Sequence, residues 1–251
     1  MVWSYVMSLR ADAQKSENRS GVATVGTTLT PICNGGYYQT PQVGGEQQLR
    51  IQAGGDANDT AAGTGAREIV LCGIDNTGAY VTETIATAGA SASALTTTSF
   101  LRLFEFWVSA SGTYVTQAGG SHAADITIED GSANVWGVIS STPFPTSQSE
   151  FAAFTVPLGK RVYVPFFHLS GDSTKITTAI MFFRDNILET AAPYTAGRLV
   201  NETILADSGE EIKPTAPFGP FGPLTDVIWM AKVDVGTAQV ECDYEMIWEN
   251  A

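Results

Sequence analysis

Hydrophobic and polar residues alternate along much of this chain with a period of two, the period at which side chains change face on a β-strand. Residues 124–129, for example, read Ala-Asp-Ile-Thr-Ile-Glu. Such stretches are short, and Gly, Pro, Asn or Asp interrupts them about every 8 to 12 residues. The pattern predicts an all-β protein, an antiparallel β-sandwich of jelly-roll-like form that comprises one domain or two packed sandwiches.

Two pairs of alternating stretches predict β-hairpins. Residues 67–74 and 80–85 are joined through Asp75-Asn76-Thr77-Gly78, in which Asn and Gly tolerate the positive φ of a tight turn. Residues 227–233 and 240–246 are joined by a short link that contains glycine and predict a second hairpin near the C-terminus. Around residue 171, two further apolar stretches predict another pair of strands.

The last predicted strand carries three acids on the face opposite to its apolar residues: Glu241, Asp243 and Glu245. Because side chains two apart lie on one side of a strand, these acids form a negative stripe. We interpret the stripe as a solubility feature or an electrostatic interface, or as a guard against wrong pairing of an edge strand.

The chain divides into an extended N-terminal arm over 1–34, a first β-sandwich over 35–145 and a second over 146–251, which could also continue the first domain. A segment rich in Ser, Thr and Pro over 140–150 is the predicted linker.

Two segments are expected to expose apolar side chains and hence to contact other proteins. In the N-terminal arm these are Trp3, Tyr5 and Leu9. In the C-terminal half they are Phe218 and Phe221, each followed by Gly-Pro in a loop that cannot form a central strand because proline lacks the backbone donor. The five residues are the predicted subunit or capsid interface.

The net charge and the distribution of apolar residues narrow the classes of partner that the protein can bind. The net charge is −13, and the 13 basic residues form no run, which argues against nucleic-acid binding. No segment approaches the about 18 consecutive apolar residues that a membrane span needs. The three cysteines, Cys33, Cys72 and Cys242, are too widely spaced for a zinc ribbon or a redox pair. Three buried free thiols are expected, with one disulfide and a spare thiol as the alternative.

The sequence offers little for catalysis, and no catalytic residue and no cofactor are predicted. Neither an HExxH nor a GxSxG motif occurs. His168 is expected to be structural and His122 solvated in a Gly/Ser loop. The glycines of Gly63-Thr64-Gly65 lack the strand-to-helix context of a nucleotide loop.

Two weaker binding features remain as alternatives. Asp56, Asn58 and Asp59 supply the oxygen ligands that Ca²⁺ prefers, although solvated turn acids are the commoner case. Tyr37 and Tyr38 could form an exposed platform that stacks on sugars.

Four tryptophans are further candidates for the same platform: Trp107, Trp136, Trp229 and Trp248. Aromatic residues at alternating strand positions usually point into the core. Trp107, Trp136 and Trp229 are therefore predicted to be core residues.

Several segments together resemble a group of virion structural proteins of marine tailed phages. Residues 59–67 read DTAAGTGAR, residues 69–75 read IVLCGID, and Glu83-Thr84 follows in the next strand. Residues 100–102 read FLR, and the turn over 154–160 reads FTVPLGK.

The resemblance covers about residues 35–170 and, more weakly, the C-terminal hairpin. It departs from the usual pattern at Cys72, Ile74 and Leu158. It implies a non-enzymatic subunit of a virion, made in the host cytoplasm, whose partners are other virion proteins such as the capsid, connector or tail proteins. We expect a capsid decoration (cement) protein that forms a homo-oligomer, for example a trimer. The alternative is a carbohydrate- or receptor-binding module of a head or tail fibre.

Overall fold

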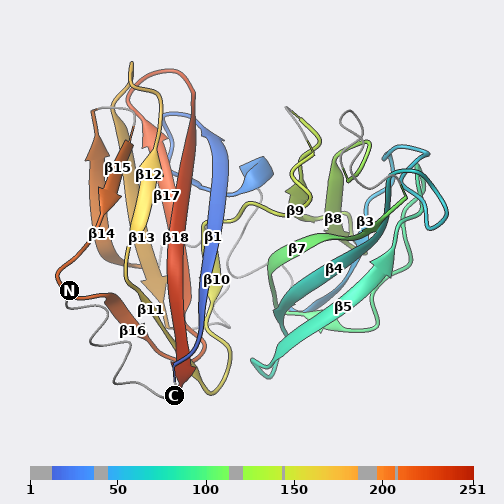
Figure 1. Cartoon of the computed structure of the whole chain (residues 1–251), viewed down its shortest axis with the longest axis horizontal. Coiled ribbons are helices and arrows are strands. Elements are labelled where there is room, and N and C mark those ends of the chain that lie inside the picture. Colours follow the sequence, from blue (N-terminus) through green and yellow to red (C-terminus); the bar gives the residue numbers. More distant parts are fainter. Residues whose placement is uncertain (1–12, 37–44, 113–120, 143–144, 186–196, 207–208) are drawn as a thin grey trace.

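The computed structural model shows a nearly all-β chain in two lobes that lie side by side (Figure 1). Eighteen strands and one short 3-10 helix, η1 (Asn34–Gly36), are formed by the residues that the structure describes. These residues are 13–36, 45–112, 121–142, 145–185, 197–206 and 209–251.

The larger lobe is a sandwich of two antiparallel sheets. The first, sheet A, has the order β15-β12-β18-β11-β16, and β1 pairs with the other side of the long strand β18. Its strands are β15 (Gly209–Ile212), β12 (Phe167–Ser170), β18 (Ala238–Asn250), β11 (Lys160–Val164), β16 (Phe218–Phe221) and β1 (Ala13–Val25). The second, sheet B, has the order β10-β17-β13-β14, with β2 on β17. Its strands are β10 (Ala153–Thr155), β17 (Asp226–Val233), β13 (Thr177–Arg184), β14 (Arg198–Leu205) and β2 (Thr30–Pro31).

The smaller lobe is a second sandwich, so the all-β prediction is confirmed and the chain contains two packed sandwiches. One sheet has the order β6-β3-β8-β9 and the other β5-β4-β7. The strands are β6 (Ser99–Phe100), β3 (Gln47–Ile51), β8 (Ile126–Asp130), β9 (Val135–Ile139), β5 (Tyr80–Ala86), β4 (Ala66–Ile74) and β7 (Arg102–Ser111). All of them lie inside the range 35–145.

Alternation buries one face of most strands, but β17 is buried on both faces. Trp229 and its neighbours two apart face sheet A in the core of the larger lobe. Ile228 and Met230 point the other way and belong to the core of the smaller lobe. The outer face of sheet B therefore carries the smaller lobe, and β17 contributes to both hydrophobic cores.

A buried ion cluster also joins the lobes. Arg102 of β7 donates to both carboxylate oxygens of Asp226 in β17, at 3.2 Å each. Arg184 of β13 donates to the same carboxylate at 3.1 Å, and the Thr155 hydroxyl donates to it at 2.6 Å. Arg102 is fully buried and Asp226 is 1% exposed. The charges of this cluster are therefore compensated by one another and not by solvent.

The predicted N-terminal arm is wrong for its described part. Residues 13–25 form β1, which pairs with β18 over nearly its whole length. Where β1 crosses the chain near Ala152, only glycine fits, because a Cβ on Gly21 would lie 2.1 Å from the Ala152 nitrogen. Residues 13–31 are therefore part of the larger sandwich and not a separate arm.

The predicted C-terminal hairpin is also wrong. β17 belongs to sheet B and β18 to sheet A, so the turn at Gly236 carries the chain from one sheet to the other. The pair expected around residue 171 behaves in the same way, with β12 in sheet A and β13 in sheet B. The hairpin between β4 and β5 is confirmed, in register from Glu68↔Ala86 to Ile74↔Tyr80.

The acidic stripe lies on an inner strand. Glu241 and Asp243 are exposed on the outer face of sheet A and Glu245 is half-buried there, as the alternation predicts. However, β18 has β1 on one side and β11 and β12 on the other, so the stripe does not protect a sheet edge. Within the described ranges, no helix is long and apolar enough to span a bilayer.

Candidate functional site

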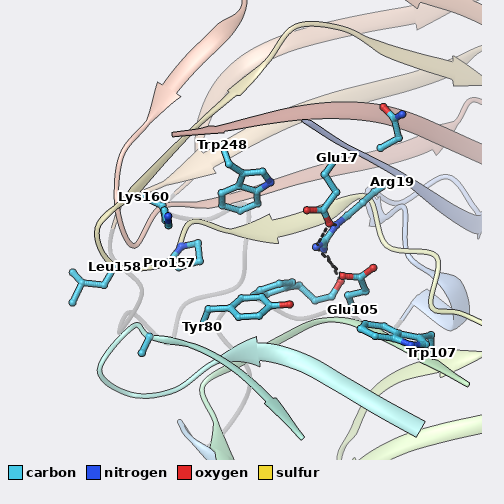
Figure 2. A pocket seen from close by; sticks show the side chains of 12 residues that line it. Glu17, Arg19, Tyr80, Glu105, Trp107, Pro157, Leu158, Lys160 and Trp248 are labelled. Carbon is cyan, nitrogen blue, oxygen red and sulfur yellow. Dashed lines mark hydrogen bonds and ion pairs between the residues drawn. The ribbon is translucent and has the colours of Figure 1, made fainter. Parts of the chain in front are cut away.

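A cleft of about 740 Å³ lies where the two lobes meet (Figure 2). The larger lobe contributes β1, the end of β18 and the turn at 157–160. The smaller lobe contributes β7 and the turn that leads into β5. The volume lies in the range of about 300–1,000 Å³ that is typical of small-molecule sites.

Aromatic side chains from both lobes line this cleft. Tyr80, the first residue of β5, is 52% exposed and packs against the Phe104 ring at 6.1 Å between centroids. Trp248 of β18 is half-buried and contacts the edge of the Phe154 ring, with 6.2 Å between centroids. Figure 2 shows Tyr80 and Trp248 on opposite walls. Such side chains present large apolar faces and polar tips.

An ion-paired group from both lobes forms one end of the cleft. Arg19 of β1 lies 2.6 Å from a Glu17 oxygen and 3.0 Å from Glu105 of β7. Its guanidinium also donates to the Phe104 carbonyl and lies 5.2 Å from the centroid of that ring. Arg19 therefore holds carboxylates of both lobes and fixes how the cleft walls are spaced.

The alternation of β1 explains why these side chains reach the cleft. Arg19 pairs with Tyr244 and Glu17 with Met246, both inward-facing residues of β18. Directly opposite residues share a face of the sheet, so Glu17 and Arg19 also lie on the inner face. Since β1 lies beyond β18 at the side of the smaller lobe (Figure 1), their side chains meet that lobe instead of sheet B.

Burial raises the pKa of Tyr80 above its ordinary value, and a hydrogen bond with Cys72 acts in the same direction. The phenol therefore stays protonated at neutral pH, and its hydrogen is directed to the Cys72 sulfur. Leu158, in the turn on the opposite wall, is also exposed to the cleft.

A second surface feature lies on the outer face of sheet B, away from the smaller lobe. Three apolar side chains lie there, in β13 and in the edge strand β14: Ile180, Leu199 and Ile204. Phe182, further along β13, packs instead on the core of the smaller lobe. Leu199 and Ile204 are 58% and 62% exposed. We call this group the outer strip; Glu202 lies on the same face, opposite Ile180.

The structure contradicts the expected exposure of Phe218 and Phe221. Both belong to β16, an outer strand of sheet A that pairs with β11. Phe221 is 5% exposed, between Phe154 and Phe183, and Phe218 packs on Phe167 at 5.8 Å. The two rings fill the core of the larger lobe because β16 turns them inward. Trp3, Tyr5 and Leu9, like Tyr37 and Tyr38, lie outside the described residues.

The oxygen-rich loop proposed for calcium has a structural use. Asp59 is buried, and its carboxylate accepts backbone N–H groups of Ala66, Ala123 and Ala124 at 2.8 to 3.1 Å. A Cβ on Gly65 would lie 2.1 Å from the same carboxylate. The DTAAGTGAR segment is thus a loop folded around one aspartate.

The two histidines are placed the other way round from the prediction. His122 is buried, and its Nε2 hydrogen-bonds the Ser140 carbonyl at 2.9 Å while its Nδ1 faces the Ser121 hydroxyl at 2.8 Å. His168 is partly exposed, 3.9 Å from Asp243 in the acidic stripe. No group of three His, Cys, Asp or Glu residues that could hold a metal occurs among the residues described.

The cysteines match the expectation of three buried free thiols. Burial raises the pKa of Cys33 and of Cys242 well above the ordinary value. Trp136 and Trp229 are core residues, as predicted. Trp107 is not: it is half-buried and lines the cleft.

Sequence reasoning missed the cleft because its residues come from five separate segments. Local signals existed for only part of it: the FTVPLGK turn supplies Pro157, Leu158 and Lys160, and Tyr80 directly follows the predicted hairpin turn. No pattern in the sequence brings these segments to Arg19 or Trp248. No protein-family model, curated protein or solved structure matches this chain.

Proposed function

We propose that the chain is a non-enzymatic structural subunit of a tailed-phage particle, and that it binds neighbouring virion proteins as a capsid decoration subunit. The observation that carries the proposal is the outer strip. Leu199 and Ile204 are exposed there beside the half-buried Ile180, and exposed apolar groups that lie on one face mark candidate protein contacts.

The strand at the margin of this surface adds a second means of contact. β14 pairs with β13 and with no other strand among those described, so one side of β14 carries backbone groups that a partner strand can bind. A subunit that docked along β14 would cover the exposed side chains of Leu199 and Ile204 at the same time.

The sequence supports the same function. The segments that resemble virion proteins, among them DTAAGTGAR, are explained here by loop structure and not by catalysis. The net charge of −13 is unfavourable for contact with packaged DNA and is compatible with an outward position on a shell. In this proposal the protein forms a homo-oligomer, for example a trimer, and resides in the virion.

The test is reconstitution on particles of the phage that encodes this chain, assembled without it. Purified chain is added, and its copy number per particle is measured by quantitative mass spectrometry. The double variant Leu199→Ser/Ile204→Ser should lower occupancy, whereas Leu95→Ser, which changes an exposed leucine of the smaller lobe, should not.

The outcomes distinguish a wrong function from a wrong contact surface. If wild-type chain does not bind the particles and is absent from native ones, the proposed function is wrong. If the double variant and the wild type bind equally, the function stands and the outer strip is not the contact surface. Native mass by light scattering reports the oligomer in the same samples.

A further inference from the structure

The cleft between the lobes combines ring faces with hydrogen-bonding groups. Tyr80 and Trp248 come from different lobes and stand on opposite walls (Figure 2). Tyr80 is more than half exposed, although its neighbour Phe104 in the same cleft is buried. Pyranose sugars have a complementary surface, since one face of the ring is formed by C–H groups and the rim carries hydroxyls.

We propose that this cleft is a binding site for a short neutral oligosaccharide whose pyranose rings pack on Tyr80 and Trp248. The inference does not rest on the proposed assembly function. In the sequence-based alternative the platform is expected near Tyr37 and Tyr38 and Trp248 is among its candidate residues, whereas Tyr80 is not.

Polar groups at the end of the cleft suit sugar hydroxyls. Glu105 is 32% exposed, and only its Oε2 atom faces Arg19. Its Oε1 atom accepts no hydrogen bond from the described part of the chain and is an acceptor for a ligand hydroxyl. The Tyr80 hydroxyl donates its hydrogen to Cys72 and offers its oxygen as an acceptor on the wall. At the other end, the ammonium group of Lys160 donates to Asn250 at 2.8 Å.

Local charge favours a neutral ligand over an anion. The cleft lining is balanced in charge: Glu17 and Glu105 face Arg19, which lies against both of them at 2.6 and 3.0 Å, and Lys160 lies at the other end. The guanidinium is therefore already neutralised, and the protein as a whole carries −13. A phosphate or sulfate would meet carboxylates here, whereas a hydroxyl can donate to them.

The walls are fixed before a ligand arrives. Arg19 of β1 and Glu105 of β7 connect the lobes at the cleft itself, and Arg102 with Asp226 connects them in the interior. A site whose rings already face each other loses little conformational freedom on binding, which favours affinity for a ligand held mainly by stacking.

Binding is tested by isothermal titration and by tryptophan fluorescence with cellotetraose, chitotetraose and maltotetraose, and with a heparin-derived tetrasaccharide as the anionic probe. We expect saturable binding of at least one neutral probe and none of the heparin fragment. Tyr80→Ala should weaken that binding about tenfold or more, a loss equal to about 1.4 kcal/mol.

Two further variants keep the result interpretable. Tyr80→Phe retains the ring and should retain most of the affinity, which also shows that position 80 tolerates substitution. Tyr163→Ala is the matched control, because Tyr163 pairs with Ile247 on the outer face of sheet A, outside the cleft.

Three binding results would overturn the proposal. They are no binding of any neutral probe to wild type, equal affinity of Tyr80→Ala and wild type, and binding of the heparin fragment alone. A native mass that changes in Tyr80→Ala, without any sugar binding, would assign the cleft to a second copy of the chain and would also overturn it.

Discussion

Replacing Asp226 by alanine should be among the most damaging single changes in this protein. The Asp226 carboxylate accepts hydrogen bonds from Arg102, Arg184 and Thr155, all of them buried. Alanine removes the acceptor and leaves guanidinium groups in an interior that solvent does not reach. The donors come from β7 in one lobe and from β13 and β10 in the other, so the loss falls on the contact between the lobes.

The size of the expected stability loss follows from the burial of the charged groups. Removing one partner of a buried ion pair costs about 3–5 kcal/mol, because the remaining charge is left uncompensated. A domain is stable by only about 5–15 kcal/mol, so Asp226→Ala should remove a large part of the free energy of unfolding. Asp185→Ala is the control: the Asp185–Arg198 pair is more than half exposed on both sides, and exposed pairs contribute about 1 kcal/mol or less.

The assay is equilibrium unfolding in urea, followed by tryptophan fluorescence and far-ultraviolet circular dichroism. We expect a midpoint far below that of the wild type for Asp226→Ala, and a small shift for Asp185→Ala. If the smaller lobe loses its attachment first, the two signals will no longer coincide in Asp226→Ala. Equal midpoints for the two variants would refute the reasoning that this cluster connects the lobes.

Two further predictions concern single loops. Asp59→Ala removes the acceptor of three backbone N–H groups and should cost roughly 2–4 kcal/mol in urea unfolding. The control Asp56→Ala should cost about 1 kcal/mol, because the half-buried Asp56 carboxylate accepts a single backbone N–H, from Asn58. Equal costs, or a melting temperature that EDTA lowers, would contradict a purely structural Asp59. Burial lowers the pKa of His122 below its ordinary 6.5, so the unfolded chain takes up the proton first and the free energy of unfolding should fall as the pH drops below about 6.5. His122→Gln keeps a donor for the Ser140 carbonyl and should lack this part of the pH dependence; identical slopes between pH 7 and pH 5 would show that His122 does not cause it.

Burial was predictable wherever it depends on a strand's own alternation. The inward set of β18, which includes Cys242 and Tyr244, is buried as expected. The predictions of burial failed where a second layer of structure covers the outer face of a strand. In β17, Ile228 and Met230 are core residues because the smaller lobe packs on them. A polar loop, likewise, does not make its histidine solvated: His122 is enclosed by contacts with Ser121 and Ser140.

The candidate site was far less predictable than the fold. Alternation of aromatic residues predicts a core position for Trp107, yet Trp107 lines the cleft between the lobes. Phe218 and Phe221 were assigned to the surface because of the neighbouring prolines, yet β16 turns both rings inward. In each case the outcome depended on which other element covers the strand, and that information is not local.

The sequence by itself determined the class of fold, most of the strands and the hairpin between β4 and β5. These follow from side-chain direction and turn chemistry, which act over a few residues. Only the tertiary structure decided that β17 and β18 lie in different sheets, that β1 pairs with β18 more than 200 residues away, and that a cleft forms between the lobes. Pairing of distant strands depends on packing and on long-range closure of the chain, and alternation is the same in a hairpin and in a connection between two sheets.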